Sequence, residues 1–458
     1  MYMTVDLTTG SPMRRILSFG IPVLIGNLIQ QLYNVVDTAI VGKTLGYNAL
    51  AAVGSTSSIN FLVLGFCIGI CGGFAIPVAQ QFGAGNHREL RRDMTGGVFL
   101  CLFFSVVITA GTLAGCRWIL TLMNTPDDIF ARAQIYIATI FAGIPVCFLY
   151  NFCAGILRSL GDSRTPVLWL VASSLLNIAL DILFIVSFRL DVFGAALATV
   201  LSQAVAGVGC LIRVCRGFPI LRTDRADWAW DGGRLVRLGV MGLPMGLQYS
   251  ITGIGSMMVQ TAVNELGTGF VAAVTAGNKI SVFLACPFDA MGATMATYGG
   301  QNVGAKKLDR LPQGLRACAF LGLCWATMAL GIIYFFGDGL SMLFMDEGGN
   351  GLLPLCRQYL RTYGAFYFPL ALVNIIRFLI QGMGFVPLAT LAGGFELAAR
   401  GMMSLLVPVM GFSAVCAASP VAWLMADAFL IPAFFLCLRR LRGKTHSRRR
   451  KRMARSFS

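Results

Sequence analysis

Polar side chains with oxygen ligands recur at helical spacing in two parts of the chain. Gln30, Asn34 and Asp37 follow an i, i+4, i+7 pattern, so a helix places them on one face. Asn177 and Asp181 are one helical turn apart in a later apolar segment. Carboxylate and amide oxygens are hard ligands, suited to Na⁺ or to a proton. These residues therefore predict a site for a small cation.

The segments that must position these residues are long and apolar. Of 458 residues, 57% are hydrophobic and 12% charged, and the mean hydropathy is +0.75. Soluble domains carry about 25% charged residues, so this composition excludes a soluble enzyme, and its apolar content excludes a disordered chain. Apolar runs near 20 residues fit a hydrocarbon core of about 30 Å. We expect an all-α polytopic membrane protein with twelve spans, at 16–41, 50–80, 94–116, 133–157, 166–188, 194–215, 239–262, 270–299, 316–336, 362–383, 387–409 and 415–437.

The basic residues indicate the orientation of these spans. Most of the 36 Lys and Arg residues fall in loops on the side of the N-terminus or in the tail, which predicts that both termini are cytoplasmic. The first apolar run is too long for a signal peptide, so we expect a multi-pass protein of the plasma membrane, in bacteria the inner membrane. The basic tail fits a solvated stop, and the alternative is an electrostatic tether to anionic lipid.

The two halves of the chain repeat at an offset of about 221 residues. Gly20–Pro22 aligns with Gly242–Pro244, and Pro145 pairs approximately with Pro369. Six spans separate the partners, so the repeats are parallel and form two six-helix bundles around a central cleft. We expect four regions: an N-terminal lobe (1–215), a cytoplasmic linker (216–238), a C-terminal lobe (239–437) and a basic cytoplasmic tail (438–458).

Acidic residues inside the spans need a reason, because a charge at the bilayer centre costs about 2.5–3.5 kcal/mol. The expected topology brings four polar residues of the first lobe to a similar depth in its outer half: Asp37, Asn177, Asp181 and Thr199. At the two acidic positions the second repeat has Met258 and Met402, which argues against a structural role shared by both halves. The alternative is an interhelical hydrogen bond that only holds the bundle together.

Other charges in the spans leave two interpretations open. Glu396 and Arg400 are i, i+4 neighbours that can neutralise each other, and Arg377 can join them, so both structural pairing and substrate contact remain. Asp427 has no identifiable partner. Lys279 and Asp289 could pair only if their helix bends. Candidates for a substrate cleft are Gln30, Tyr33, Asn34, Met257, Met258, Phe283, Arg377, Glu396 and Arg400.

Several motifs together resemble the multidrug and toxic compound extrusion (MATE) family over about residues 10–440. They are Pro22 followed by residues 30–42 (Gln-Gln-Leu-Tyr-Asn-Val-Val-Asp-Thr-Ala-Ile-Val-Gly), the loop Gln81–Gly85, the stretch Arg158–Pro166, the pair Asn177 and Asp181, and Gln301–Ala305. The resemblance implies a twelve-helix, two-lobe exporter of cationic amphiphilic compounds, driven by an inward Na⁺ or H⁺ gradient. The family's cation site maps onto the four residues named above. One branch has an acid in the seventh span, where this chain has Met257 and Met258.

We therefore expect an antiporter that works by alternating access, with Na⁺ or H⁺ as coupling ion and no cofactor. Its partners would be small organic cations and membrane lipid, with no nucleic acid, and the protein would be a monomer. The alternative is a flippase for a lipid-linked saccharide, whose pyrophosphate would need a basic cleft. An enzyme is not expected, because the loops contain no His, Cys or Ser arrangement with nucleophile–base spacing.

Overall fold

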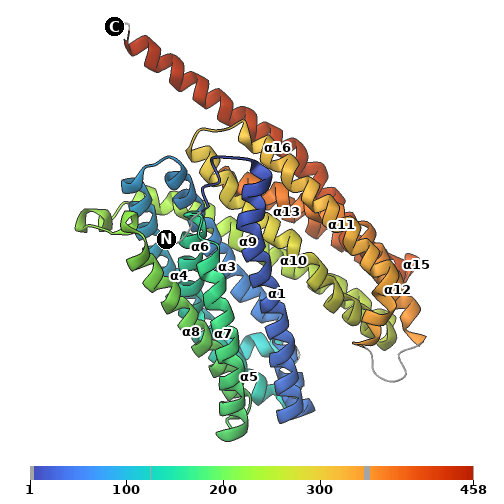
Figure 1. Ribbon diagram of the computed structural model, residues 1–458. Helices are drawn as coiled ribbons and strands as arrows, with labels where there is room; N and C mark the ends of the chain where they lie inside the picture. Colours follow the sequence, from blue (N-terminus) through green and yellow to red (C-terminus); the bar gives the residue numbers. More distant parts are fainter. Residues whose placement is uncertain (1–4, 124, 345–350, 457–458) are drawn as a thin grey trace. The chain divides into compact units, whose positions relative to one another are not determined.

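The computed structural model describes residues 5–123, 125–344 and 351–456, with side chains as far as residue 443. Within these residues the regular structure is entirely helical (Figure 1). The expected all-α class is confirmed. The basic side chains beyond residue 443 lie outside the described part, although their backbone continues the last helix.

The first half of the chain forms eight α-helices and a short π-helix. The predicted span 50–80 is divided at Thr56, where the Ser- and Thr-containing stretch 55–58 interrupts the apolar run. The helices are α1 (Pro12–Leu45), α2 (Tyr47–Ser55), α3 (Ser57–Gly83), α4 (His87–Leu122), α5 (Asp127–Ala142), α6 (Ile144–Ser159), α7 (Arg164–Asp181), the π-helix η1 (Ile182–Ser187) and α8 (Asp191–Gly217).

The second half begins with two short 3₁₀ turns in the linker and continues with eight α-helices. The last helix continues as far as Ser456 (Figure 1). The elements are η2 (Pro219–Leu221), η3 (Arg225–Trp228), α9 (Gly232–Leu266), α10 (Thr268–Gly304), α11 (Arg310–Met342), α12 (Leu353–Ala365), α13 (Tyr367–Gly382), α14 (Val386–Leu405), α15 (Val407–Met410) and α16 (Phe412–Ser456).

The described helices account for the twelve expected spans. Eight helices are long and apolar enough to cross a membrane, and the bent pairs α5–α6 and α12–α13 bring the number to ten. The remaining two are α9 and α14, which overlap the predicted spans 239–262 and 387–409. Glu396 and Arg400 lower the hydropathy of α14, since each replaces an apolar side chain in a helix of 20 residues.

The internal repeat is visible in the backbone as a bend at corresponding places. The helix axis turns by 43° between α5 and α6 and by 47° between α12 and α13. Pro145 lies in the first turn of α6 and Pro369 in the first turn of α13. Proline is tolerated in a first turn, because the missing N–H would have no intrahelical acceptor there. The prolines that align in the two halves therefore mark the same break in both.

The described chain divides into two compact units. Unit 1 comprises Val5, Ser18–Phe82 and Asn86–Met257, and unit 2 comprises Asp6–Leu17, Gly83–Gly85 and the chain from Met258 onward. Helix α9 thus begins in unit 1 and passes to unit 2 between Met257 and Met258. The lobe and linker boundaries drawn from the sequence stay a prediction.

Within unit 1, glycines bring the first part of α9 into backbone contact with α3. A Cβ on Gly69 would lie 2.5 Å from the carbonyl oxygen of Met245, and one on Gly73 would lie 2.5 Å from that of Met241. The glycines of α3 are four residues apart, which is the spacing that lets membrane helices approach closely. This contact explains why the start of the second repeat belongs to unit 1.

Candidate functional site

Two carboxyl groups in the membrane-spanning part of unit 1 face each other. Asp37 on α1 and Asp181 at the end of α7 lie within hydrogen-bonding reach, and Asp181 is completely buried. If both groups are ionised, neither has a hydrogen to donate to the other. Asp37 Oδ1 and both oxygens of Asp181 then have no hydrogen-bond partner in the described part of the chain. A contact of this kind needs a shared proton or a bridging cation.

Three further polar side chains surround this pair. The Nδ2 amide of Asn177 donates to Thr199 Oγ1 at 3.4 Å, and Tyr33 Oη lies 3.4 Å from the same oxygen. Thr199 in turn donates to the carbonyl of Ala195 at 3.0 Å. Because the hydroxyl hydrogen of Thr199 is used in that bond, Thr199 cannot also donate to Asn177. The Oδ1 atom of Asn177 has no hydrogen-bond partner among the described residues. Unit 1 therefore gathers all four residues of the predicted cation site, together with Tyr33 from the predicted cleft.

The local backbone explains how the two acids meet. A Cβ on Gly26 would lie 2.9 Å from Val167, so α1 and α7 approach closely on the N-terminal side of the acid in each helix. Immediately after Asp181 the helix widens into the π-helical turn Ile182–Ser187. Such turns inside α-helices are frequent at functional sites. Here the π-helical turn changes the direction of the backbone immediately after the carboxyl group of Asp181.

The sequence interpretation missed Tyr136 on α5. The charges of Asp37 and Asp181 both act on its hydroxyl, and the residue as a whole is 9% exposed. A single tyrosine in the apolar segment Ile135–Ile137 gives no spacing signal, so its place beside the acids could not be found from the sequence.

The other predicted cleft residues are distributed over both units. Gln30 and Asn34 are exposed on α1, and Phe283 on α10 is half-buried. Met257 and Met258 are 40% and 39% exposed and belong to different units. Contact of these residues with a substrate stays a prediction.

Unit 2 contains a buried group of four charges. Glu396 on α14 accepts a hydrogen bond from Arg377 on α13 through Oε1, and its Oε2 lies 3.6 Å from Arg400 Nη2. Asp427 on α16 lies close enough for Arg377 and Glu396 to act on it electrostatically. None of the four is more than 6% exposed, and their formal charges balance. Asp427, for which the sequence indicated no partner, is the fourth member of this charge cluster.

Lys279 and Asp289, which the sequence left as an open pair, do not pair. The Lys279 ammonium lies 5.6 Å from the centre of the Phe344 ring, a cation–π contact. At 1.5 Å per residue, ten helical residues separate the two charges by about 15 Å.

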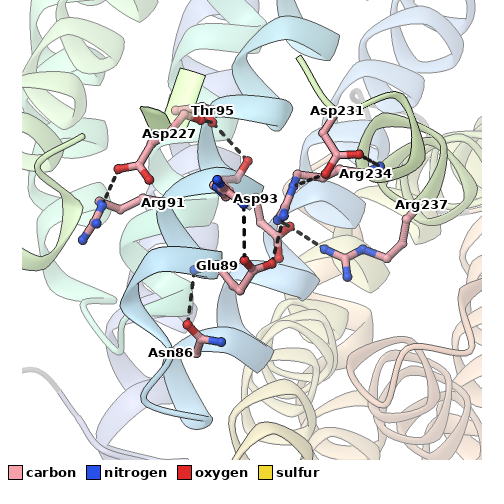
Figure 2. A network of polar contacts seen from close by, with 10 residues as sticks. Asn86, Glu89, Arg91, Asp93, Thr95, Asp227, Asp231, Arg234 and Arg237 are labelled. Atoms are coloured by element: carbon pink, nitrogen blue, oxygen red, sulfur yellow. Dashed lines mark hydrogen bonds and ion pairs between the residues drawn. The ribbon is translucent and has the colours of Figure 1, made fainter. Parts of the chain in front are cut away.

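A second polar network joins α4 to the start of α9 outside the apolar part of unit 1 (Figure 2). Asp93 is completely buried, and its Oδ1 accepts hydrogen bonds of 2.5 Å from both Arg234 Nη1 and Arg237 Nη2. Arg234 also donates to Glu89 at 2.8 Å. The sequence did not indicate this network, because its partners are more than 140 residues apart.

The linker turn η3 is fastened to α4 beside this network (Figure 2). Arg91 donates to Asp227 at 2.6 Å, and Thr95 donates to the Asp227 carbonyl at 2.7 Å. Burial raises the pKa of Asp227, but the hydrogen bonds from Arg91 and from the Asp224 backbone, with the charges of Arg91 and Arg92, together outweigh it and leave that pKa below its usual range. The backbone N–H of Arg234 likewise lowers the pKa of Asp231. Asp227 thus holds the linker turn η3 to α4, and Asp231 accepts a hydrogen bond from the backbone at the start of α9.

The MatE family model matches residues 22–183 and 244–417, once in each half and over well more than half of the chain. The chain belongs to the MatE family. Members of this family are membrane transporters, so this MATE protein is a multi-pass transporter and not an enzyme.

Two relatives from Bacillus subtilis show how similar other MATE proteins are. The "Probable multidrug resistance protein YpnP" is 29% identical over 81% of this chain and 82% of its own length. The "Probable multidrug resistance protein YoeA" is 29% identical over 72% and 73%. A solved "outward-facing conformation of a multidrug resistance MATE family transporter" matches with a TM-score of 0.90 at 22% identity, covering 97% of this chain and 99% of that one. This match shows the shared twelve-helix, two-repeat fold.

Proposed function

We propose that this MATE protein is a multidrug exporter that exchanges cationic amphiphilic compounds for Na⁺ or H⁺. The observation that carries the proposal is the contact between the carboxyl groups of Asp37 and Asp181. The names of the Bacillus relatives support the multidrug role. The coupling cation would bind at Asp37, Asn177, Asp181 and Thr199.

Electrostatic repulsion gives this site its affinity for a cation. Two carboxylates about 4 Å apart repel each other by about 4 kcal/mol at an effective dielectric constant near 20. A proton shared between Asp37 and Asp181, or a Na⁺ bridging them, removes that repulsion and also satisfies Asn177 Oδ1 in the second case. Loss of the cation restores it and drives the acids apart.

Helix α1 is the element that can respond. It contains Pro22, which leaves one carbonyl of the helix without its usual donor, and Gly26, which packs tightly on Val167 of α7. Bending of α1 near these residues would move Asp37 relative to Asp181. Cation binding would in this way be linked to the shape of the face that α1 presents to substrate.

The test is gradient-driven transport with purified protein in proteoliposomes. Ethidium movement is followed under an imposed pH gradient alone and an imposed Na⁺ gradient alone, which identifies the coupling ion. We expect Asp37→Asn to reduce transport at least tenfold without loss of folded protein. Asp191→Asn is the matched control, because Asp191 is a carboxylate of unit 1 outside the site, paired with Arg132 at 2.8 Å. Transport by Asp37→Asn at the wild-type rate would refute the proposal.

The flippase alternative is not favoured. A pyrophosphate would need a basic cleft, and within the described part of the predicted spans the two arginines, Arg377 and Arg400, are both engaged by Glu396. Multidrug export remains the function that the site supports.

A further inference from the structure

An open pocket lies where the linker meets the start of α9. It has a volume of about 210 Å³ and is lined by Asp231, Gly233, Arg234 and Arg237, all of unit 1. A cavity needs about 10–15 Å³ to hold one water molecule. The pocket therefore has room for a polar group much larger than water, such as a phosphate with a short side arm.

The two exposed charges of this pocket have opposite signs. The side chain of Asp231 is 51% exposed and that of Arg237 is 45% exposed. The guanidinium of Arg234 lies next to both and is enclosed, because Glu89 and Asp93 engage it (Figure 2). Among the described residues Arg237 donates one hydrogen bond, from Nη2 to Asp93, although a guanidinium has five N–H donors. A ligand in the pocket thus meets one carboxylate and one guanidinium.

Two tryptophans indicate that the pocket lies at the level of the membrane interface. Trp228 and Trp230 are exposed and contact Phe99 of α4, at distances of 5.8 and 6.0 Å between ring centroids. Phe99 lies between the buried charge of Asp93 and Leu102, where the exposed apolar surface of α4 begins. Tryptophan is enriched in membrane proteins at the level of the lipid head groups. The start of α9 is therefore in a position to meet phospholipid head groups.

An apolar stripe continues from the pocket along α9. Between residues 236 and 247 the exposed positions other than Arg237 lie within about 30° of one line along the helix, and they are Val236, Val240, Leu243 and Leu247. Leu238 and Met245, on the opposite side, are buried against α4 and α3. The stripe is about 16 Å long, close to half of a hydrocarbon core of about 30 Å. It can therefore receive an acyl chain of one leaflet.

We propose that this pocket binds the head group of phosphatidylethanolamine, with the phosphate on Arg237, the ammonium on Asp231 and an acyl chain along the apolar stripe. The two exposed charges select this ligand class. A phosphate alone is attracted by Arg237 and repelled by Asp231, whereas a phosphate joined to a primary ammonium matches both. The ammonium also donates charge-assisted hydrogen bonds that a carboxylate accepts. None of these residues belongs to the proposed cation site, so the inference is independent of the coupling mechanism.

Native mass spectrometry of the purified, delipidated protein tests the site, because it counts the lipid molecules that are bound. The protein is titrated with lipids of identical acyl chains: phosphatidylethanolamine, phosphatidylcholine, whose quaternary ammonium has no hydrogen to donate, and phosphatidylglycerol, which has no ammonium. We expect the wild-type protein to bind phosphatidylethanolamine with a Kd about fivefold lower than for either other lipid. Equal Kd values, or tightest binding of phosphatidylglycerol, would overturn the inference. This measurement needs no variant, so it does not depend on the folding of one.

Two variants then test the two halves of the head group separately. Arg237→Gln removes the partner of the phosphate and should raise Kd for all of these lipids about tenfold. Asp231→Asn removes the partner of the ammonium and should abolish the preference for phosphatidylethanolamine. Arg222→Gln is the matched control, at an exposed position of the linker outside the pocket, and should bind as the wild type does. Wild-type affinity in Arg237→Gln, or a retained preference in Asp231→Asn, would contradict the assignment.

Discussion

Substitution of Gly382 by alanine tests whether α13 and α10 are in backbone contact as described. Gly382 is the last residue of α13, and a Cβ there would lie 2.2 Å from the carbonyl oxygen of Ala296 and 3.1 Å from the backbone nitrogen of Gly300. Ordinary contacts of a Cβ begin near 3.4 Å. The two helices would therefore have to separate by about 1 Å, and overpacking of this kind costs about 1–3 kcal/mol.

The matched control is Gly394→Ala in the interior of α14. No atom lies within 4 Å of its Cβ, so the substitution adds only helix propensity, worth about 1 kcal/mol. For a unit of about 200 residues, 1 kcal/mol shifts Tm by about 2–4 °C. We thus expect Gly382→Ala to lower Tm by about 4–8 °C and Gly394→Ala to raise it by about 3 °C.

The assay is thermal unfolding of the purified variants in one detergent, followed by size-exclusion chromatography of the protein that stays folded. The opposite signs of the two shifts matter more than their size, because both variants make the same chemical change. Gly382→Ala with an unchanged or increased Tm would refute the close approach of α13 and α10.

Two further predictions concern buried charges. Asp93→Asn removes the buried negative charge that faces the guanidinium groups of Arg234 and Arg237, so we expect a loss of about 2 kcal/mol and a clear drop in Tm, whereas Asp309→Asn should leave Tm unchanged because its pair is exposed. Equal shifts in these two variants would contradict the argument from burial. Glu396→Ala leaves Arg377 and Arg400 without their shared carboxylate, at a cost of about 3–5 kcal/mol. Little folded protein should then be recovered from membranes, and a wild-type yield would show that the cluster is dispensable.

The arrangement of the spans could be predicted from the sequence because the bilayer imposes a length and an apolar composition on each helix. The features that could not be predicted are those that neither helix length nor apolar composition determines. The division of span 50–80 at Thr56 depends on local hydrogen bonds of the stretch 55–58. The burial of Asp93 depends on Arg234 and Arg237, which approach it only in the folded protein.

For the candidate cation site, too, one property could be predicted from the sequence and another could not. Depth along the membrane could be estimated for Asp37 and Asp181, since helices rise by a fixed amount per residue. The direction in which each side chain points depends on helix rotation and on the π-helical turn after Asp181, neither of which the apolar pattern specifies. For the same reason Tyr136 and the neighbours of Asp427 were missing from the sequence interpretation.

The two repeats share their backbone and differ in their charges, and this difference bears on mechanism. The bends of 43° and 47° are nearly the same, so the backbone of the second repeat could have kept an acid pair at the corresponding positions. Instead Met258 and Met402 stand at those positions, and four charges of unit 2 form the buried, balanced cluster around Glu396. The proposed coupling chemistry is therefore confined to the first repeat, where the cation acts on α1. The second repeat keeps the corresponding bend of the backbone without the acid pair.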